Sequence, residues 1–162
     1  MMDSAPISQF IESTYPDPPV PLISELGREI ETKVRTVVGP TLRNSVLPRE
    51  INILSPRAQE YFQRAHEAEL GHLIEDLRDH GKEEQSWRAI NDAMRAVGEL
   101  MLTHKADGPF ILGARPSYAD FFIAGNLQCV RVIDEGVFQR IVSYPGFKDI
   151  YKACLPYMER QD

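Results

Sequence analysis

Glu69 and His72 have the spacing of a metal-binding pair, because residues three apart lie on the same face of a helix. Di-iron helix bundles use Glu-x-x-His pairs of this kind, but they need two such pairs and two further carboxylates. His66 lies nearby, yet the sequence contains no second Glu-x-x-His. We therefore expect no metal site in this protein.

The two cysteines, Cys129 and Cys154, could act as nucleophiles if a histidine activated one of them. Two isolated cysteines support neither a disulfide framework nor a zinc knuckle, which favours a reducing compartment and predicts a cytoplasmic protein. Cys129 falls in a strongly apolar segment, where cysteines usually behave as small buried hydrophobes. We expect it to pack in the core.

Two serine motifs stand where helices are expected to begin. Asp3 and Ser4 precede a short apolar repeat, and a helix N-terminus there would present free N–H groups and a positive dipole to an anion. Ser117 and Asp120 have the spacing of a capping box before a long apolar run. In such a box, the serine hydroxyl accepts from the N–H of the acid, whose carboxylate accepts from the serine N–H. Alone, this pair indicates a helix start and no function.

Apolar residues recur at helical spacing along most of the chain, whereas no run alternates at the period of a strand. The predicted helices cover 3–15, 24–38, 55–70, 82–103, 117–132, 135–141 and 145–158. Pro40 is expected to end or kink the second of these, and residues 44–54 are predicted as loop or irregular helix. The helix at 117–132 is apolar on most of its circumference, which predicts a buried central helix. The sequence therefore predicts an all-α fold.

The composition excludes several classes of protein. The chain has 162 residues, of which 43% are hydrophobic and 26% charged, as is typical of a globular protein. Its formal net charge of −6 is a poor match for nucleic-acid phosphates, so we expect no nucleic-acid partner. We also expect no membrane span, and the N-terminus lacks the pattern of a secretory signal.

Several segments of the sequence resemble one enzyme family. Residues 108–113 followed by 115–120 are similar to the loop and capping box that open the central helix of the C-terminal domain of glutathione transferases. Residues 2–16 resemble the last helix of that family's thioredoxin-like half, which begins with an acid-Ser pair and closes with Tyr-Pro. Residues 61–77 and 153–157 are similar to the etherase-like fungal and bacterial branch. The resemblance covers nearly the whole chain.

This resemblance implies an all-α bundle of five to seven helices and a division of the chain into three parts. Residues 1–16 would be the remnant last helix of a thioredoxin-like domain. Residues 17–23 would be a proline-rich linker, and residues 24–162 the helical domain that resembles the C-terminal domain of the family.

The resemblance also implies roles for individual residues. In the family, the acid-Ser pair contacts the γ-glutamyl end of glutathione, which implies that role for Asp3 and Ser4. The first long helix of the helical half supplies most of the wall of the electrophile pocket. By position, the candidates for that wall are Val38, Thr41, Leu42 and Arg43. The thiol-activating residue of the family belongs to the thioredoxin-like half, upstream of this chain, so we name no catalytic residue.

The function implied is that of a glutathione transferase-like protein, which conjugates glutathione to a small electrophile or removes it, with secondary metabolism as one setting. Two alternatives stay open: a non-catalytic helical interaction module, and a short form with a new, glutathione-independent activity. Dimerisation is the habit of the family, so a homodimer is one expected state. Ile7, Phe10 and Ile11 would pack on a β-sheet in the intact family. Here we expect them to dock on the bundle, to pair with a second copy or to be disordered.

Overall fold

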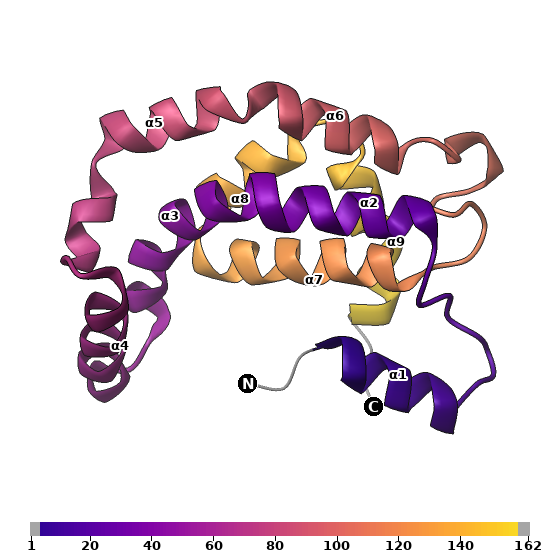
Figure 1. Ribbon diagram of the computed structural model, residues 1–162, viewed down its shortest axis with the longest axis horizontal. Helices are drawn as coiled ribbons and strands as arrows, with labels where there is room; N and C mark the ends of the chain where they lie inside the picture. Colours follow the sequence, from indigo (N-terminus) through magenta and orange to yellow (C-terminus); the bar gives the residue numbers. More distant parts are fainter. Residues whose placement is uncertain (1–3, 159–162) are drawn as a thin grey trace.

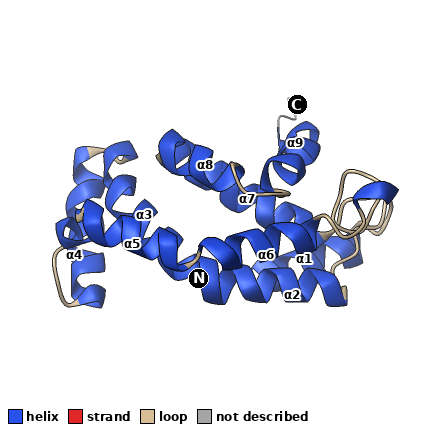
Figure 2. Ribbon diagram, turned by 90° about the horizontal axis from the view of Figure 1, so that it is seen from above, coloured by secondary structure: helices blue, strands red, loops and turns tan. Residues whose placement is uncertain are grey.

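The structure, a computed structural model, describes residues 4–158, which form helices joined by turns (Figure 1). The α-helices are α1 (Ser4–Thr14), α2 (Glu25–Lys33), α3 (Gly39–Glu50), α4 (Pro56–Leu70), α5 (His80–Ala89), α6 (Asn91–Met101), α7 (Tyr118–Ile133), α8 (Glu135–Val142) and α9 (Phe147–Met158). A π-helical turn occupies Val34–Val38, and 3₁₀ turns occupy Ile51–Ile53, Ile74–Arg78 and Lys105–Asp107. No strand occurs between residues 4 and 158 (Figure 2), which confirms the all-α prediction.

Two of the helices in the bundle are bent. α2 continues through the π-helical turn into α3, and α5 is followed directly by α6. When each bent pair is taken as one helix, residues 25–158 form a bundle of six helices. The prediction of five to seven helices is confirmed.

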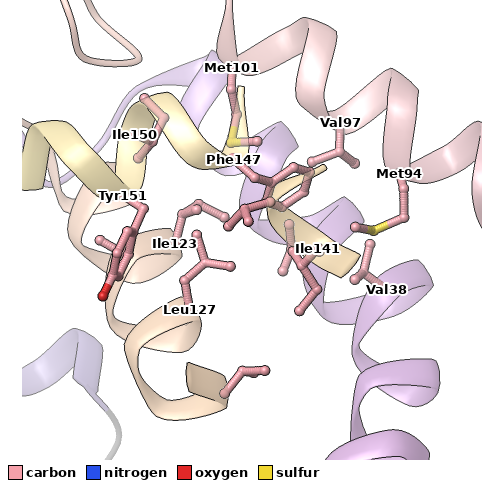
Figure 3. Close-up of a cluster of buried hydrophobic side chains, with 14 of the residues drawn as sticks. Val38, Met94, Val97, Met101, Ile123, Leu127, Ile141, Phe147, Ile150 and Tyr151 are labelled. Carbon is pink, nitrogen blue, oxygen red and sulfur yellow. The ribbon is translucent and has the colours of Figure 1, made fainter. Parts of the chain in front are cut away.

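α7 is the central helix of the bundle and packs against α2, α3, α8 and α9. Figure 3 shows buried side chains from several helices that converge around it. Those labelled there are Val38, Met94, Val97, Met101, Ile123, Leu127, Ile141, Phe147, Ile150 and Tyr151. Full burial of one such side chain contributes on the order of 1.5–3 kcal/mol. The apolar sides of the helices therefore hold the bundle together around α7.

The start of α7 is fixed by the buried carboxyl group of Asp120. One of its oxygens accepts hydrogen bonds from the Ser117 N–H at 2.8 Å and from the Ser117 hydroxyl at 2.6 Å. The other oxygen accepts from the Ile111 N–H at 2.8 Å. In addition, the Tyr118 N–H donates to the Pro21 carbonyl at 3.0 Å. The N-terminus of α7 thus forms hydrogen bonds with both the loop that precedes it and the proline-rich segment.

Pro40 does not end the helix that begins at Glu25. The chain widens into the π-helical turn, where the Gly39 N–H donates to the Val34 carbonyl. Pro40 then falls in the first turn of α3, where its missing N–H costs little. The widened turn therefore accommodates the proline without a break in the helical path.

Residues 44–54, predicted as loop or irregular helix, are helical for most of their length. α3 continues to Glu50, and a 3₁₀ turn follows. Ser45 is fully buried, and its hydroxyl accepts a hydrogen bond from the Trp87 indole N–H at 2.9 Å. Ser45 and Pro48 occupy buried positions of this helix, where a helical pattern would have apolar helix-forming residues. The spacing of apolar residues in the sequence therefore does not indicate a helix here.

The helix predicted over 82–103 is divided at Ile90, which corrects that prediction. Ile90 has φ −97° and ψ 2°, outside the α-helical range, and it separates α5 from α6. Its carbonyl still accepts from the Met94 N–H at 2.8 Å, so hydrogen bonding continues across the division. Trp87 and Met94 are buried on either side, which explains why the apolar spacing gives no sign of the division.

α1 keeps its apolar face in solvent. The side chains of Ile7, Phe10 and Ile11 are 40%, 67% and 51% exposed. An extended segment joins α1 to α2 (Figure 1), and in it the Val20 N–H donates to the Glu12 carboxylate at 3.0 Å. α1 is a formed helix, and the expectation that it docks on the bundle is wrong, because the bundle offers these side chains no cover. Pairing with a second copy stays a prediction.

Candidate functional site

A groove lies between the bent α2–α3 helix, α4 and α7, and we call it the central groove. Its volume is about 580 Å³. Its apolar lining includes Val34, Leu42, Val46, Leu47, Phe122 and Val130. Its polar lining is formed by Arg35, Arg43, Glu50, His66, Asn126 and Cys129. Small-molecule sites typically have this size and combine apolar walls with a few polar groups.

One face of the bent helix supplies much of this lining. Its residues follow one another at steps of three or four positions, namely Arg35, Gly39, Leu42, Val46 and Glu50. Residues at these steps lie one above another on a helix. Phe122, Asn126 and Cys129 follow the same steps on α7 and form the opposite wall. Helical packing of α3 against α7 therefore determines which side chains face the groove.

Two arginines line the central groove in different environments. The guanidinium carbon of Arg35 lies 4.6 Å from the centroid of the Phe122 ring, which is a cation–π contact. Arg43 forms an exposed ion pair with Glu69, with 2.7 Å between Nη2 and Oε1. Glu69 thereby compensates the charge of Arg43 directly.

Glu50 and His66 place two ionisable groups in the same groove. Burial raises the pKa of the Glu50 carboxyl group, and the nearby His66 partly offsets this effect. The Nδ1 atom of His66 lies 2.9 Å from the carbonyl oxygen of Phe62. A carbonyl oxygen only accepts, so Nδ1 carries the proton and Nε2 bears the lone pair when the ring is neutral. The pair can therefore donate a proton to a bound ligand or accept a proton from it.

Replacement of Glu50 by glutamine tests the raised pKa. The folded protein holds the Glu50 proton more tightly than the unfolded chain, so the stability of the wild type falls as pH rises from the ordinary glutamate range through the raised pKa. Glu50→Gln removes this loss. We expect the variant to gain stability relative to the wild type between about pH 4 and pH 7, by less than about 1 kcal/mol because the group is only partly buried. Urea unfolding at both pH values measures the change, and an identical difference at the two would contradict it.

The environment of Cys129 corrects the expectation that it packs in the core. Cys129 is exposed and lines the central groove, whereas Cys154 is fully buried. α7 turns Ile123 and Leu127 toward the core, and Cys129 falls outside that face. Partial desolvation in the groove wall, together with the charge of Glu50, raises the pKa of the Cys129 thiol. Burial raises the pKa of the Cys154 thiol to about 12, so neither thiol is activated as a nucleophile.

The residues named for the electrophile pocket divide into two groups. Leu42 and Arg43 line the central groove. Val38 is 1% exposed and belongs to the hydrophobic core, and Thr41 is buried outside the groove lining. Position in the helix alone did not separate the side chains that face the groove from those that face the core.

Other candidate residues lie elsewhere in the chain. Ser4 is the first residue of α1, and Asp3 lies outside the described residues, as does the side chain of Ser4. Sequence reasoning missed several residues that line the groove, namely Arg35, Glu50, His66, Phe122, Asn126 and Cys129. Those on the bent helix and on α7 follow three-four steps, but such spacing does not show which side of a helix faces a groove. His66 lies on α4 without such a signal, and Glu50 falls in the segment predicted as loop or irregular helix.

A second hollow, of about 450 Å³, is lined by charged side chains that are engaged with one another. Arg49 pairs with Glu83 at 3.0 Å and with Asp134 at 3.1 Å. Arg140 pairs with Glu84 at 2.7 Å. This network joins α3, α5 and α8, so we interpret it as structural.

The part of the chain that the structure describes has neither a cluster of metal-ligating side chains nor a helix that could span a membrane. No group of three or more His, Cys, Asp or Glu side chains gathers there closely enough to hold a metal ion. Glu69 pairs with Arg43, and His72 lies 3.7 Å from Asp76. No helix of residues 4–158 has both the length and the apolar character that a bilayer crossing needs.

The fold agrees with the comparisons of this chain with known proteins. The family model described as the C-terminal domain of glutathione S-transferase matches residues 27–146. The chain belongs to the glutathione S-transferase family. Its all-α bundle is the C-terminal helical domain of that family, as the sequence resemblance indicated.

Individual members of the glutathione S-transferase family resemble the chain over almost its whole length. The glutathione S-transferase-like protein ustS of Aspergillus flavus is 30% identical over 173 residues, which cover 99% of this chain and 62% of that protein. The crystal structure of glutathione transferase GSTFuA3 from Phanerochaete chrysosporium is 25% identical, with a TM-score of 0.77, over 99% of this chain and 66% of that one. A Ceriporiopsis subvermispora glutathione S-transferase, CsGST83044, solved in complex with glutathione, shares the fold at 20% identity and a TM-score of 0.76, over 97% of this chain and 65% of that one. The chain thus spans less than two thirds of the length of these relatives.

Proposed function

We propose that this chain forms the helical half of a glutathione transferase-like enzyme. In this proposal, the central groove holds the small electrophile to which glutathione is joined or from which it is removed. The groove carries this proposal, because its volume of about 580 Å³ and its apolar wall suit a small organic molecule. Its ionisable side chains, Glu50 and His66, supply proton transfer beside that wall. Family membership supports glutathione as the co-substrate.

The proposed division of the chain is residues 1–16 as the last helix of a thioredoxin-like half, 17–23 as a linker and 24–162 as the helical domain. The exposed apolar face of α1 supports this division, because such a face suits packing against a sheet. Asp3 and Ser4 are proposed to contact the γ-glutamyl end of glutathione at the start of this helix. We propose no residue of this chain as the thiol activator. The two free thiols support a reducing compartment such as the cytoplasm.

Calorimetric titration with glutathione and with S-hexylglutathione tests the proposed function. The hexyl group is expected to enter the central groove, so the conjugate should bind with a dissociation constant below about 1 mM and more tightly than glutathione. Leu42→Trp, which fills the groove, should weaken binding of the conjugate by at least about tenfold.

Leu73→Trp is the matched control, because Leu73 is 56% exposed and does not line the groove. This variant should bind like the wild type. The proposal fails if neither compound binds at millimolar concentration, or if the two tryptophan variants bind equally well.

An interaction module is the second candidate function, and the exposed side chains of α1 favour it. Phe10 and Ile11 would be covered in a homodimer or by another protein. Sedimentation equilibrium of the chain, compared with the variant that carries both Phe10→Ser and Ile11→Ser, distinguishes these states. Self-association that the double variant abolishes would support a dimer through α1, and a monomer in both cases would exclude it.

A further inference from the structure

The central groove adjoins another groove beside α7, with which it shares lining residues. The second groove has a volume of about 420 Å³, and we call it the aromatic groove. Three residues line this groove alone, namely Tyr118, Phe121 and Gly125. Four residues line both grooves, namely Arg35, Phe122, Asn126 and Cys129. These four residues, which we call the junction, therefore mark where an elongated ligand would pass from one groove to the other.

Arg35 is the charged residue of the junction. Its guanidinium group covers the Phe122 ring, with 4.6 Å from its carbon to the ring centroid. A cation–π contact uses the positive charge and leaves the N–H donors of the guanidinium group to other acceptors. Glu31, one turn earlier on the same helix, is its acidic neighbour, and it does not line either groove. The junction thus presents a cation with N–H donors beside apolar surface.

The other charges of the grooves are neutralised or distant. Arg43 is paired with Glu69 at 2.7 Å. Glu50 stands fifteen residues after Arg35 on the bent helix, which corresponds to about 22 Å along its axis. The side chains of Asn126 and Cys129 are uncharged or weakly acidic. Of the two arginines that line the grooves, Arg43 has a carboxylate in direct contact, whereas the charge of Arg35 is offset by the nearby Glu31 without such a contact among the described residues.

We propose that the junction binds the carboxylate of a small amphiphilic electrophile, with Arg35 as the residue that pairs with the anion. The apolar body of the ligand lies along Phe122 into the central or the aromatic groove. This inference rests on the proposed function, since it assigns a chemical class to the molecule held in the groove. It makes Arg35 a specificity-determining residue, because a neutral analogue of the same shape lacks the ion pair.

The test compares 4-phenylbutyrate with 4-phenylbutyramide, which share an apolar body and differ in charge. At pH 7, the wild type should bind the carboxylate about five to ten times more tightly than the amide, as a partly exposed ion pair with hydrogen bonds would give. Arg35→Met should remove this preference and leave the affinity for the amide unchanged. Arg35→Lys should keep part of it, because a lysine offers charge without the planar fork. Arg28→Met is the matched control and should keep the full preference, since Arg28 is an exposed arginine of α2 that lines neither groove.

The outcomes separate this inference from the proposed function. Equal affinity of the wild type for the carboxylate and the amide would overturn the inference and leave the groove as a neutral site. Retention of the preference in Arg35→Met would overturn it as well. If neither compound binds at millimolar concentration, the inference falls, whereas the proposed function is decided separately by the titration with S-hexylglutathione.

Glutathione also carries carboxylates, so a competition experiment determines the source of the anion. The wild type is saturated with 4-phenylbutyrate and then titrated with glutathione. Binding of both compounds together supports an electrophile carboxylate at the junction. Displacement of 4-phenylbutyrate by glutathione would assign the junction to the tripeptide and overturn the inference.

Discussion

Replacement of Asp120 by alanine is expected to lower the free energy of unfolding by about 3–5 kcal/mol. The Asp120 carboxyl group is fully buried and accepts from the N–H groups of Ile111 and Ser117, both at 2.8 Å. Alanine would leave both N–H groups without an acceptor in the interior, and each such loss costs about 1–3 kcal/mol. Chemical denaturation measures the change.

Asp79→Ala is the matched control for Asp120→Ala. Asp79 caps α5 and also accepts from two backbone N–H groups, those of Gly81 and Lys82, at 2.9 and 3.2 Å. Because Asp79 is exposed, water can replace its carboxylate, and the loss of stability should be clearly smaller. An equal loss in the free energy of unfolding for the two variants would contradict the role of burial at the N-terminus of α7. Asp120→Asn keeps an acceptor oxygen for one of the N–H groups. If this variant folds, its free energy of unfolding should lie between those of the wild type and Asp120→Ala.

Replacement of Gly98 by alanine is expected to destabilise the protein by roughly 2–4 kcal/mol. α6 approaches the turn before α9 at this glycine. A methyl group at position 98 would overlap the carbonyl oxygen of Pro145 and lie 2.9 Å from its carbonyl carbon. Because the obstacle is backbone, it can move only if the turn and α9 shift away from α6. Thermal or urea unfolding measures the loss.

Gly125→Ala is the control for this prediction, since Gly125 also lies inside a helix. Apart from its chain neighbours and the nearby backbone of its own helix, no described atom lies within 4 Å of the position of an added methyl group. Alanine is the better helix former by about 0.5–1 kcal/mol, so this variant should be more stable than the wild type. Opposite signs at the two glycines are the expected result. A neutral or stabilising Gly98→Ala would contradict the close packing of α6 against Pro145.

Helices whose apolar residues face a single core could be predicted from the sequence. α7 is the clearest example, because the spacing of Ile123 and Leu127 and the Ser117–Asp120 pattern indicate both its core face and its start. Local spacing contains the start of the helix and the place of these two core residues. It does not show which other side chains leave the core, since it also predicted a core position for Cys129, which lines the groove. The third hydrogen bond of Asp120, from Ile111, depends on the tertiary path of a loop and could not be read from that spacing.

Features that depend on geometry beyond one turn could not be predicted. Pro40 predicts either an end or a kink of the helix, and only the π-helical turn before it, which continues the helical path, decides between them. Ile90 divides α5 from α6 without any change in the apolar spacing.

The candidate site was predictable only in part. Leu42 and Arg43 were named by their place on the first long helix, and both line the central groove. Arg35 and Cys129 join them only because α7 packs across that helix, which places residues far apart in the sequence on facing walls. A helical residue faces the core or the groove according to the side of the helix on which it lies. The packing of the neighbouring helix determines which side is which.

Nuclear magnetic resonance titration of the ¹⁵N-labelled chain with S-hexylglutathione tests the central groove as the ligand site most directly. The largest changes in amide chemical shift are expected at residues that line the groove on both walls, with Leu42 and Cys129 as reporters. Residues around the ion-pair network of Arg49 and Arg140 should change little, because that hollow is occupied by paired charges. Changes centred on that network, or none at millimolar ligand, would contradict the assignment of the groove.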